Sequence, residues 1–294
     1  MPASTGVFIS NSLAEISRLS PSSVVDIGCG FGLWGFLSRL YLDAFAGHPY
    51  KEDWQCRIDG VEVFPKYIMP HQRFLYDNIH IGNIKDIVDQ LDDYDLYVFG
   101  DVLEHLPKQD AQRVLNTAYQ KAVKAVLINV PLGDGWLRES PSDNPHEAHL
   151  SAWTLDDFIE YSPKILGECA FPDIGDYAAI LIDKTLSDSQ LAGQWCANGR
   201  LYIERNPEFA QTCFARAIAM GCANPDAHLE LANISLQQHK VDDAVALLRD
   251  AMNQFPKNER PYDMLGNLLL ALDRVEEAHQ VFSSKPSSNT DTDR

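Results

Sequence analysis

The sequence predicts an α/β domain with a doubly wound, mostly parallel sheet, followed by an all-helical repeat domain. Strand and helix patterns alternate through the N-terminal part, and the first predicted strand ends in a glycine-rich turn. Farther along, the apolar spacing becomes helical and recurs with a period of about 34 residues. We therefore expect domains at 1–186 and 187–282, and a polar, disordered tail at 283–294.

Composition and charge narrow the class of protein. The 294 residues include 24 Lys and Arg against 42 Asp and Glu, a formal net charge of -18. Such a surface repels phosphate backbones, so we expect no nucleic-acid partner. The six cysteines are scattered without a Cys-x-x-Cys pair, which is typical of reduced thiols. No signal sequence and no apolar window of about 18 residues is present, so we expect a cytoplasmic protein without a membrane segment.

A short N-terminal helix is predicted at 10–19, where Pro21 stops it before the first strand. The strand at 24–27 ends in a turn that contains Gly28, Gly30 and Gly32. Glycines allow a positive φ and a close approach of a ligand to the backbone. The helix that follows directs its N-terminal amides toward that ligand.

Two details distinguish this turn from a dinucleotide-binding turn. Leu33 stands where the dinucleotide fingerprint has its third glycine. Asp26, two positions before Gly28, would repel a pyrophosphate but suits a ligand that carries a positive amino group. The alternative is a glycine turn that only joins a strand to a helix.

The second and third predicted strands provide further ligand contacts. Glu62 ends the strand at 57–63, where a carboxylate can accept hydrogen bonds from both ribose hydroxyls; the alternative is a solvated strand end. The segment 43–55 before this strand is interpreted as an insertion that helps to cover the ligand. Asn83 lies in the turn after the third strand.

The later elements continue the alternation of strand and helix. We predict a fourth strand at 94–100, a helix at 109–121, a fifth strand at 125–130 that ends at Pro131, and a last strand at 178–183 after a turn.

The glycine turn resembles motif I of the class I S-adenosylmethionine-dependent methyltransferases. The phrases at 59–65 and 101–105, and the segment at 144–149 followed by Trp153, are similar to one bacterial branch of that family. The resemblance implies a seven-stranded Rossmann-like methyltransferase sheet and S-adenosylmethionine as cofactor. It further implies an acceptor such as a small-molecule, sugar or glycan hydroxyl, and leaves a nitrogen acceptor open.

The resemblance also implies which residues bind the cofactor. The methionine end is assigned to the first turn, the ribose to Glu62 and the adenine to the turn after the third strand. Where the family commonly has an aspartate, this chain has Asn83, whose amide oxygen can still accept a hydrogen bond. The full set is Asp26, Gly28, Cys29, Gly30, Gly32, Glu62, Val63, Asn83, Ile84 and Asp101.

Methyl transfer requires alignment of the acceptor and removal of its proton. Groups for this task are expected after the fourth and fifth strands. Glu104 and His105 follow the fourth strand, and the long segment 131–153 contains His149. This segment also contains Trp136 and Trp153, Asp134, His146 and Glu147, and its length predicts an active-site lid. The predicted catalytic residues are His149, His105 and Glu104.

The same side chains form a candidate metal site. Asp101, Glu104 and His105 occupy one helical turn, and His149 could complete the set from the lid. The arrangement resembles the metal-binding set of certain small-RNA 2′-O-methyltransferases, which implies Mg²⁺ or a similar ion that lowers the pKa of a bound hydroxyl. In the alternative, no metal binds, and His149 is a general base or a substrate ligand.

The C-terminal third contains a repeat. Residues 225–256 align with 257–282, and Leu231, Ala244 and Leu248 correspond to Leu265, Ala278 and Phe282. The pattern resembles tetratricopeptide repeats, with a degenerate first unit that contains Phe214; the alternative is a generic helical bundle. Such repeats imply a protein partner or self-association. The rival to an enzyme is therefore a non-catalytic scaffold with a degenerate methyltransferase domain.

Overall fold

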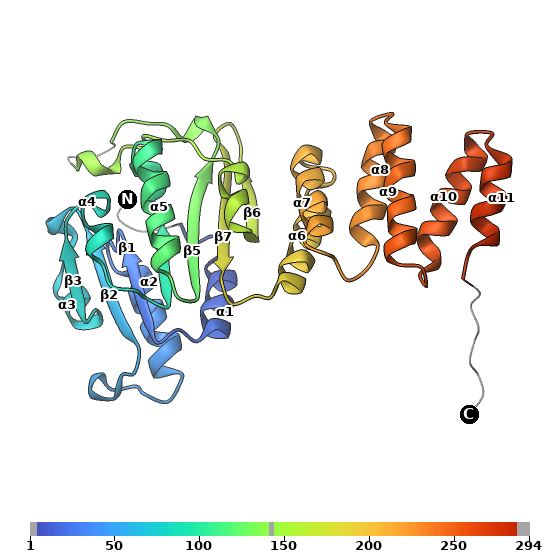
Figure 1. The fold of residues 1–294 in the computed structure, drawn as a ribbon. Coiled ribbons are helices and arrows are strands. Elements are labelled where there is room, and N and C mark those ends of the chain that lie inside the picture. Colours follow the sequence, from blue (N-terminus) through green and yellow to red (C-terminus); the bar gives the residue numbers. More distant parts are fainter. Residues whose placement is uncertain (1–4, 141–143, 287–294) are drawn as a thin grey trace, which may run out of the picture. The chain divides into compact units, whose positions relative to one another are not determined.

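The computed structural model describes residues 5–140 and 144–286 (Figure 1). The chain divides into two compact units, Met1–Thr185 and Leu186–Arg294. Among the described residues, no helix combines the length and the apolar character that a membrane crossing requires.

The N-terminal unit is built on a seven-stranded sheet with the strand order β3-β2-β1-β4-β5-β7-β6. β1 pairs in parallel with β2 and β4, whereas β7 runs antiparallel to both β5 and β6. The predicted doubly wound, mostly parallel sheet is therefore confirmed. The strands are β1 (Ser23–Ile27), β2 (Arg57–Glu62), β3 (Asn78–Ile81), β4 (Leu96–Gly100), β5 (Ala125–Leu132), β6 (Lys164–Phe171) and β7 (Gly175–Asp183).

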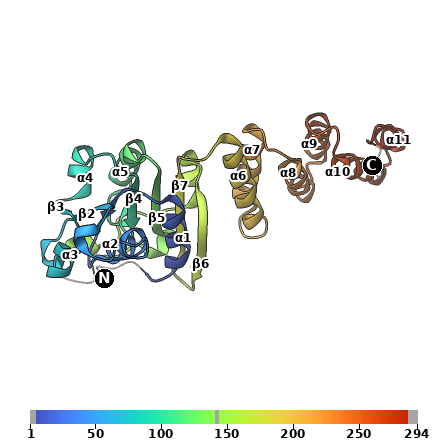
Figure 2. The same cartoon turned by 90° about the horizontal axis from the view of Figure 1, so that it is seen from below.

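Helices cover both faces of this sheet (Figure 2). One face carries α1 (Ile9–Leu19), α2 (Leu33–Arg39) and α3 (Pro70–Leu75), and the other carries α4 (Ile84–Ile87) and α5 (Lys108–Lys121). The strands are apolar on both sides because both sides are covered. The core beneath α1 and α2 includes the fully buried residues Val24, Ile58, Leu96, Val98 and Leu127.

The structure differs from the sequence-based expectation at the antiparallel edge. β5 does not end at Pro131 but continues to Leu132, because β7 pairs Pro131 with Tyr177. β6 was not predicted from the sequence. Its residues are mostly half-buried at the edge of the sheet, so the strand lacks the continuous apolar run of the central strands.

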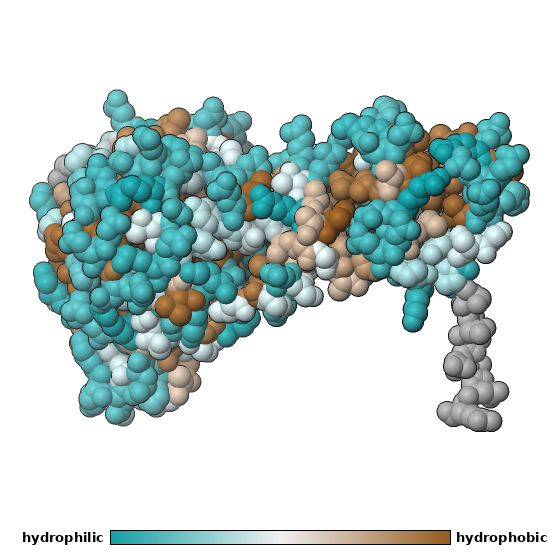
Figure 3. Space-filling model, viewed as in Figure 1, coloured by the Kyte–Doolittle hydropathy of each residue, from teal (hydrophilic) through white to brown (hydrophobic). Residues whose placement is uncertain are grey.

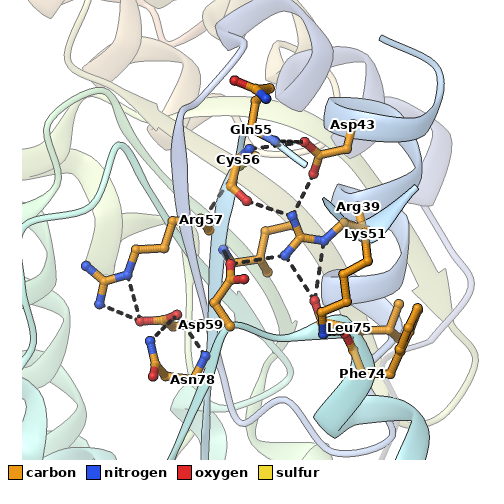
Figure 4. A network of polar contacts seen from close by, with 12 residues as sticks. Arg39, Asp43, Lys51, Gln55, Cys56, Arg57, Asp59, Phe74, Leu75 and Asn78 are labelled. Carbon is orange, nitrogen blue, oxygen red and sulfur yellow. Dashed lines mark hydrogen bonds and ion pairs between the residues drawn. The ribbon is translucent and has the colours of Figure 1, made fainter. Parts of the chain in front are cut away.

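The segment 43–55 is fastened to the start of β2 (Figure 4). Buried Arg39 donates to Asp43 at 2.7 Å and to the Cys56 carbonyl at 2.6 Å, and its guanidinium lies 4.0 Å from the Trp54 ring centre. Asp43 in turn accepts from the backbone amides of Gln55 and Cys56. This network holds the segment at the amino end of β2, whereas ligands of doubly wound sheets bind at the carboxyl ends. The expectation that it covers the ligand is therefore wrong.

The C-terminal unit is helical, and its consecutive helices pack in pairs. The helices are α6 (Asp188–Tyr202), α7 (Pro207–Ala219), α8 (Asp226–Gln237), α9 (Val241–Gln254), α10 (Glu259–Ala271) and α11 (Val275–Ser283). The predicted tail begins inside α11 at Ser283, and its residues 287–294 lie outside the described part of the chain.

Each helix pair places a small residue against a large one. A Cβ added to Gly199 would lie 2.7 Å from the Phe214 ring, and one added to Gly266 would overlap the Phe282 ring. Ala232 and Leu248 occupy the corresponding positions of the middle pair and share one buried cluster. The sequence repeat therefore corresponds to a repeated contact between paired helices.

Candidate active site

A cleft lies at the carboxyl ends of β1, β2 and β4. It encloses about 850 Å³ of empty space, part of which is open to solvent. The sequence-predicted residues that line it are Gly28, Cys29, Gly30, Glu62, Val63, Asn83, Ile84, Asp101 and His105. The sheet therefore brings most of the predicted cofactor residues to one cleft. Asp26, Gly32, Glu104 and His149 do not line it.

The glycine turn forms one wall of the cleft. Gly28, Gly30 and Gly32 have φ values of 68°, 48° and 82°, which glycine adopts without strain. A Cβ on Gly28 would lie 2.6 Å from a Val102 methyl group. Gly32 precedes α2 as its N-cap residue. Glycine is thus required at 28 for packing as well as for backbone conformation.

Glu62 joins this turn to the end of β2. Its carboxylate accepts hydrogen bonds from the backbone amides of Gly30 at 2.9 Å and Phe64 at 2.8 Å, one on each oxygen. Burial raises the pKa of Glu62, and these amide hydrogen bonds oppose that rise. Each carboxylate oxygen can accept a second hydrogen bond. A fixed acceptor for a pair of hydroxyls therefore lines the cleft.

Asp26 lies behind the turn rather than in the cleft. Its Oδ2 accepts from the Tyr76 hydroxyl at 2.6 Å and from the Gly35 amide at 3.1 Å. Burial raises the pKa of Asp26 to about 7. In this arrangement the carboxyl fastens α2 and Tyr76 beneath the turn, and it does not offer the contact to a ligand amino group that the sequence suggested.

Asp101 follows β4 in a left-handed conformation, with φ of 58°. Its side chain lines the cleft, and its Oδ2 accepts from the Tyr177 hydroxyl at 3.0 Å. A non-glycine residue with this φ is strained, and such strain is concentrated at functional sites. The structure thus places a carboxylate where β4 meets the turn after β1.

Asn83 and Ile84 form the opposite side of the cleft, at the start of α4. The Asn83 side-chain oxygen accepts from the Lys85 amide at 3.2 Å and so acts as the N-cap of α4. This cap fixes the direction of the Asn83 amide group, which leaves its nitrogen as a donor toward neighbouring groups.

The predicted lid segment supplies part of the cleft wall. Trp153 is fully buried and stacks on Phe158, with its ring centre 5.3 Å away. Asn144, His146 and Glu147 reach the cleft, whereas Asp134 does not line it. The Tyr67 hydroxyl donates a hydrogen bond to Glu147 and so connects the lid to the loop after β2.

Glu104, His105 and His149 converge at the base of the lid. Their potential metal-ligating atoms all lie within 4.8 Å of one another, and Asp101 is not part of this group. His105 donates from Nδ1 to the Ala148 carbonyl at 3.0 Å; because a carbonyl oxygen only accepts, Nδ1 carries the ring proton. Burial raises the pKa of Glu104 well above its usual value and lowers the pKa of both histidines.

The sequence does not predict three residues of this region, namely Tyr67, Arg138 and Tyr177. Tyr67 contacts Glu147 and Tyr177 contacts Asp101, which are 80 and 76 positions away, whereas Arg138 contacts His149 within the same lid segment. Tyrosines and arginines are common on protein surfaces, and no local motif distinguishes these three. Their positions become evident only when the loop after β2, the lid and β7 are brought together.

Comparisons with known proteins give a family match in the C-terminal region. A family model described as tetratricopeptide repeat matches residues 201–268 and 235–294. The C-terminal region is therefore helical and similar to tetratricopeptide repeats, as predicted. A comparison with curated protein sequences gives no match.

Solved structures resemble the two parts of the chain separately. The chain is similar to TehB from Haemophilus influenzae, with 15% identity, a TM-score of 0.42, and coverage of 61% of this chain and 63% of TehB. It is also similar to 1,6-didemethyltoxoflavin-N1-methyltransferase from Burkholderia thailandensis, with 17% identity, a TM-score of 0.41, and coverage of 61% and 78%. MamA is 20% identical over 34% of this chain and 58% of its own, with a TM-score of 0.30. The chain thus spans less than two thirds of the TehB and MamA chains.

Proposed function

We propose that the N-terminal unit is an S-adenosylmethionine-dependent methyltransferase. The observation that carries this proposal is the Glu62 carboxylate, which two backbone amides hold at the wall of the cleft beside the glycine turn. A carboxylate fixed at the end of the second strand is suited to a ribose with two free hydroxyls. Asp101 adds a second carboxyl group to the same cleft, which disfavours a pyrophosphate and favours a cationic ligand.

The residues present fit S-adenosylmethionine. The ribose would bind Glu62, the adenine would lie beside Asn83 and Ile84, and the methionine end would lie along Gly28–Gly30 toward Asp101. When bound, this cofactor supplies a methyl group on a sulfonium. The backbone at Gly28 and Gly30 lacks side chains that would fill the space beside the turn.

His105 is the group best placed to act on an acceptor, because it lines the cleft. Its Nδ1–H is held by the Ala148 carbonyl, so Nε2 is left as the proton acceptor. Burial lowers the pKa of His105, which keeps the ring neutral and able to accept a proton near pH 7. Glu104 and His149 pack behind it and position the ring. We propose a small-molecule or glycan hydroxyl as the acceptor.

A methyl-transfer screen tests this function. Full-length protein is incubated with S-adenosylmethionine carrying an isotopically labelled methyl group and with panels of nucleotide sugars, glycans and small alcohols. We expect labelled product from one class of hydroxyl, and we expect His105→Asn to abolish it while S-adenosylhomocysteine still binds. Cofactor binding without turnover on any acceptor would favour the scaffold alternative, and transfer that survives His105→Asn would remove the assigned base.

We further propose that the tetratricopeptide repeats bind a protein partner or a second copy of the chain. Apolar side chains gather over α8, α9 and α10 on the face shown in Figure 3. A shallow groove across α7, α8 and α9 combines apolar Leu231 and Leu247 with charged Lys240, Asp243 and Asp250. Sedimentation equilibrium over a range of concentrations separates self-association from a monomer that needs a partner. If a dimer is observed, its loss in Leu247→Asp would assign the dimer contact to this groove.

The cysteines of the described residues are all free, in keeping with the proposed cytoplasmic location.

A further inference from the structure

Three side chains with ligand atoms meet beside the cleft, outside the region assigned to the cofactor. Glu104 and His105 lie in the 3₁₀ turn Leu103–His105 after β4. His149 comes from the lid, where its backbone forms an antiparallel bridge with Arg138. Glu104 is 1% exposed and His149 is 8% exposed, so this is an interior cluster rather than a surface group of acidic residues.

Three buried polar atoms of this cluster are left unsatisfied. Among the described residues, neither carboxyl oxygen of Glu104 has a hydrogen-bond partner, and Nδ1 of His149 has none either. A buried polar group without a partner costs about 1–3 kcal/mol, and such groups are rare in native proteins. The unsatisfied atoms belong to neighbouring side chains whose ligand atoms lie within 4.8 Å of one another, as expected of a cation site without its ion.

The His105 imidazole is already oriented for coordination. His105 donates its Nδ1–H to the Ala148 carbonyl, which turns Nε2 toward Glu104, 4.0 Å from Oε1. A backbone acceptor on the far nitrogen is a common support for a histidine that binds a metal. The ligand atoms lie within 4.8 Å of one another, compared with about 3.4 Å between ligands of a tetrahedral ion with bonds of about 2.1 Å. A closure of at most about 1.4 Å between any two of these atoms would complete the site.

We propose that Glu104, His105 and His149 bind a divalent transition-metal ion of the class that prefers imidazole, such as Zn²⁺ or Co²⁺. Mg²⁺, the ion expected from the sequence, prefers oxygen ligands, whereas this cluster offers two nitrogens and one carboxylate. Three protein ligands leave at least one position open, and His105 places the ion next to the cleft. With the ion bound, Nε2 of His105 would be a ligand in place of the free base, and the ion would bind and orient the acceptor oxygen; this role rests on the proposed methyl transfer, whereas the binding itself does not.

Arg138 allows an independent test of this site. Its Nη2 lies 3.1 Å from Nε2 of His149, and because a guanidinium only donates, Nε2 accepts and the ring proton resides on Nδ1. Coordination through Nδ1 requires that proton to move to Nε2, so the bond from Arg138 must be released. Arg138 is exposed, so there is solvent into which its side chain can turn. Removal of its side chain should therefore strengthen metal binding, because it removes both this hydrogen bond and a positive charge beside the ion.

The test is a direct metal titration of the full chain, stripped of metal with a chelator. Co²⁺ is followed by its visible absorption and Zn²⁺ by calorimetry, with Mg²⁺ in parallel. We expect one tight Co²⁺ or Zn²⁺ ion per chain, without a thiolate-to-cobalt band, and weaker Mg²⁺ binding. Glu104→Gln and His149→Asn should each weaken binding about 100-fold or more, and Arg138→Met should strengthen it several-fold. His146→Asn, at the cleft but outside the cluster, is the matched control.

Two results would overturn the proposal. One is the absence of saturable binding by the wild-type chain. The other is an affinity that Glu104→Gln and His149→Asn leave unchanged while circular dichroism shows that both variants are folded. Mg²⁺ binding tighter than Zn²⁺ would overturn the assignment of the ion class. S-adenosylhomocysteine binding is measured on the same samples, so a failure of the proposed enzyme is distinguished from a failure of the metal site.

Discussion

Two buried carboxyl groups near the glycine turn differ in what they can do, although they lie on neighbouring strands. Glu62 accepts from two backbone amides and lines the cleft, whereas Asp26 accepts from Tyr76 and the Gly35 amide behind it. The amide hydrogen bonds favour the charged form of Glu62. Asp26 is fully buried and its pKa rises to about 7. The first carboxyl group is therefore available to a ligand and the second stabilises the fold.

Truncation of Glu62 should weaken cofactor binding. Glu62→Ala removes the acceptor for the ribose hydroxyls, and hydrogen bonds to a charged group contribute about 1.5–3 kcal/mol each. We expect the Kd for S-adenosylhomocysteine to rise at least tenfold, as measured by calorimetry. Asp86→Ala, which removes an exposed carboxylate from α4, is the control and should leave the Kd unchanged. Equal affinity in Glu62→Ala and wild type would contradict the role of Glu62.

Asp26 should make the stability depend on pH. Its pKa is about 7 in the folded chain, against about 3.9 in an unfolded chain. Between these values the folded state holds a proton that the unfolded state has released, so the free energy of unfolding falls as the pH rises. The contribution amounts to as much as roughly 4 kcal/mol. Urea denaturation at several pH values should show this slope in wild type and a flatter profile in Asp26→Asn; identical profiles would refute it.

At the scale of elements, helix pairing in the repeats depends on contacts between a small and a large residue. Gly266 faces Phe282 so closely that a methyl group would overlap the ring, whereas Gly193 of α6 has no atom within 4 Å of an added Cβ. Packing therefore requires glycine at position 266. At position 193 it does not, and there glycine only lowers the helix propensity of α6.

A pair of alanine substitutions separates these circumstances. Gly266→Ala should lower the free energy of unfolding by about 1–3 kcal/mol, because it overpacks the α10–α11 contact. Gly193→Ala should raise it by about 0.5–1 kcal/mol through helix propensity. Urea denaturation followed by circular dichroism measures both. A stabilising Gly266→Ala would show that α10 and α11 do not pack as described.

One of the contacts that hold the lid is the hydrogen bond from Tyr67 to Glu147. Tyr67→Phe removes this bond and retains the ring. Hydrogen exchange at residues 144–149 should become faster in the variant, while exchange in the central strands should stay unchanged. Tyr97→Phe, which removes a hydroxyl that donates to the Asp92 carbonyl far from the lid, is the matched control. Faster exchange in both variants alike would argue against a local latch.

The central elements could be predicted from the sequence because their signals are local. Apolar runs mark β1, β2, β4 and β5, and three glycines mark the turn. The orientation of Asp26 depends on Tyr76, which is 50 residues away, and could not be read from its neighbours. β6 and the continuation of β5 past Pro131 depend on pairing with β7. The sequence thus identified Glu62, Asn83 and His105 at the cleft but could not place Arg138 or Tyr177.

At the scale of the whole molecule, the residues assigned to the cofactor and to the metal ion all belong to the unit Met1–Thr185. The repeats contribute none of these side chains. Binding of the cofactor should therefore be a property of the first unit alone, and the repeats should determine which partner or which copy it meets.

A chain that ends after residue 186, before α6, tests this division. It should bind S-adenosylhomocysteine with a Kd within about twofold of the full chain, because no cleft residue is removed. Calorimetry gives the comparison, and circular dichroism confirms that the shortened chain is folded. A folded fragment that no longer binds would show that the repeats take part in the cofactor site.

The most direct test of the central claim is a calorimetric titration of the full-length chain with S-adenosylhomocysteine and, in parallel, with NAD⁺. The cleft with its two carboxyl groups and its glycine turn predicts a single site for S-adenosylhomocysteine and none for NAD⁺. Saturable binding of NAD⁺ without binding of S-adenosylhomocysteine would contradict the account.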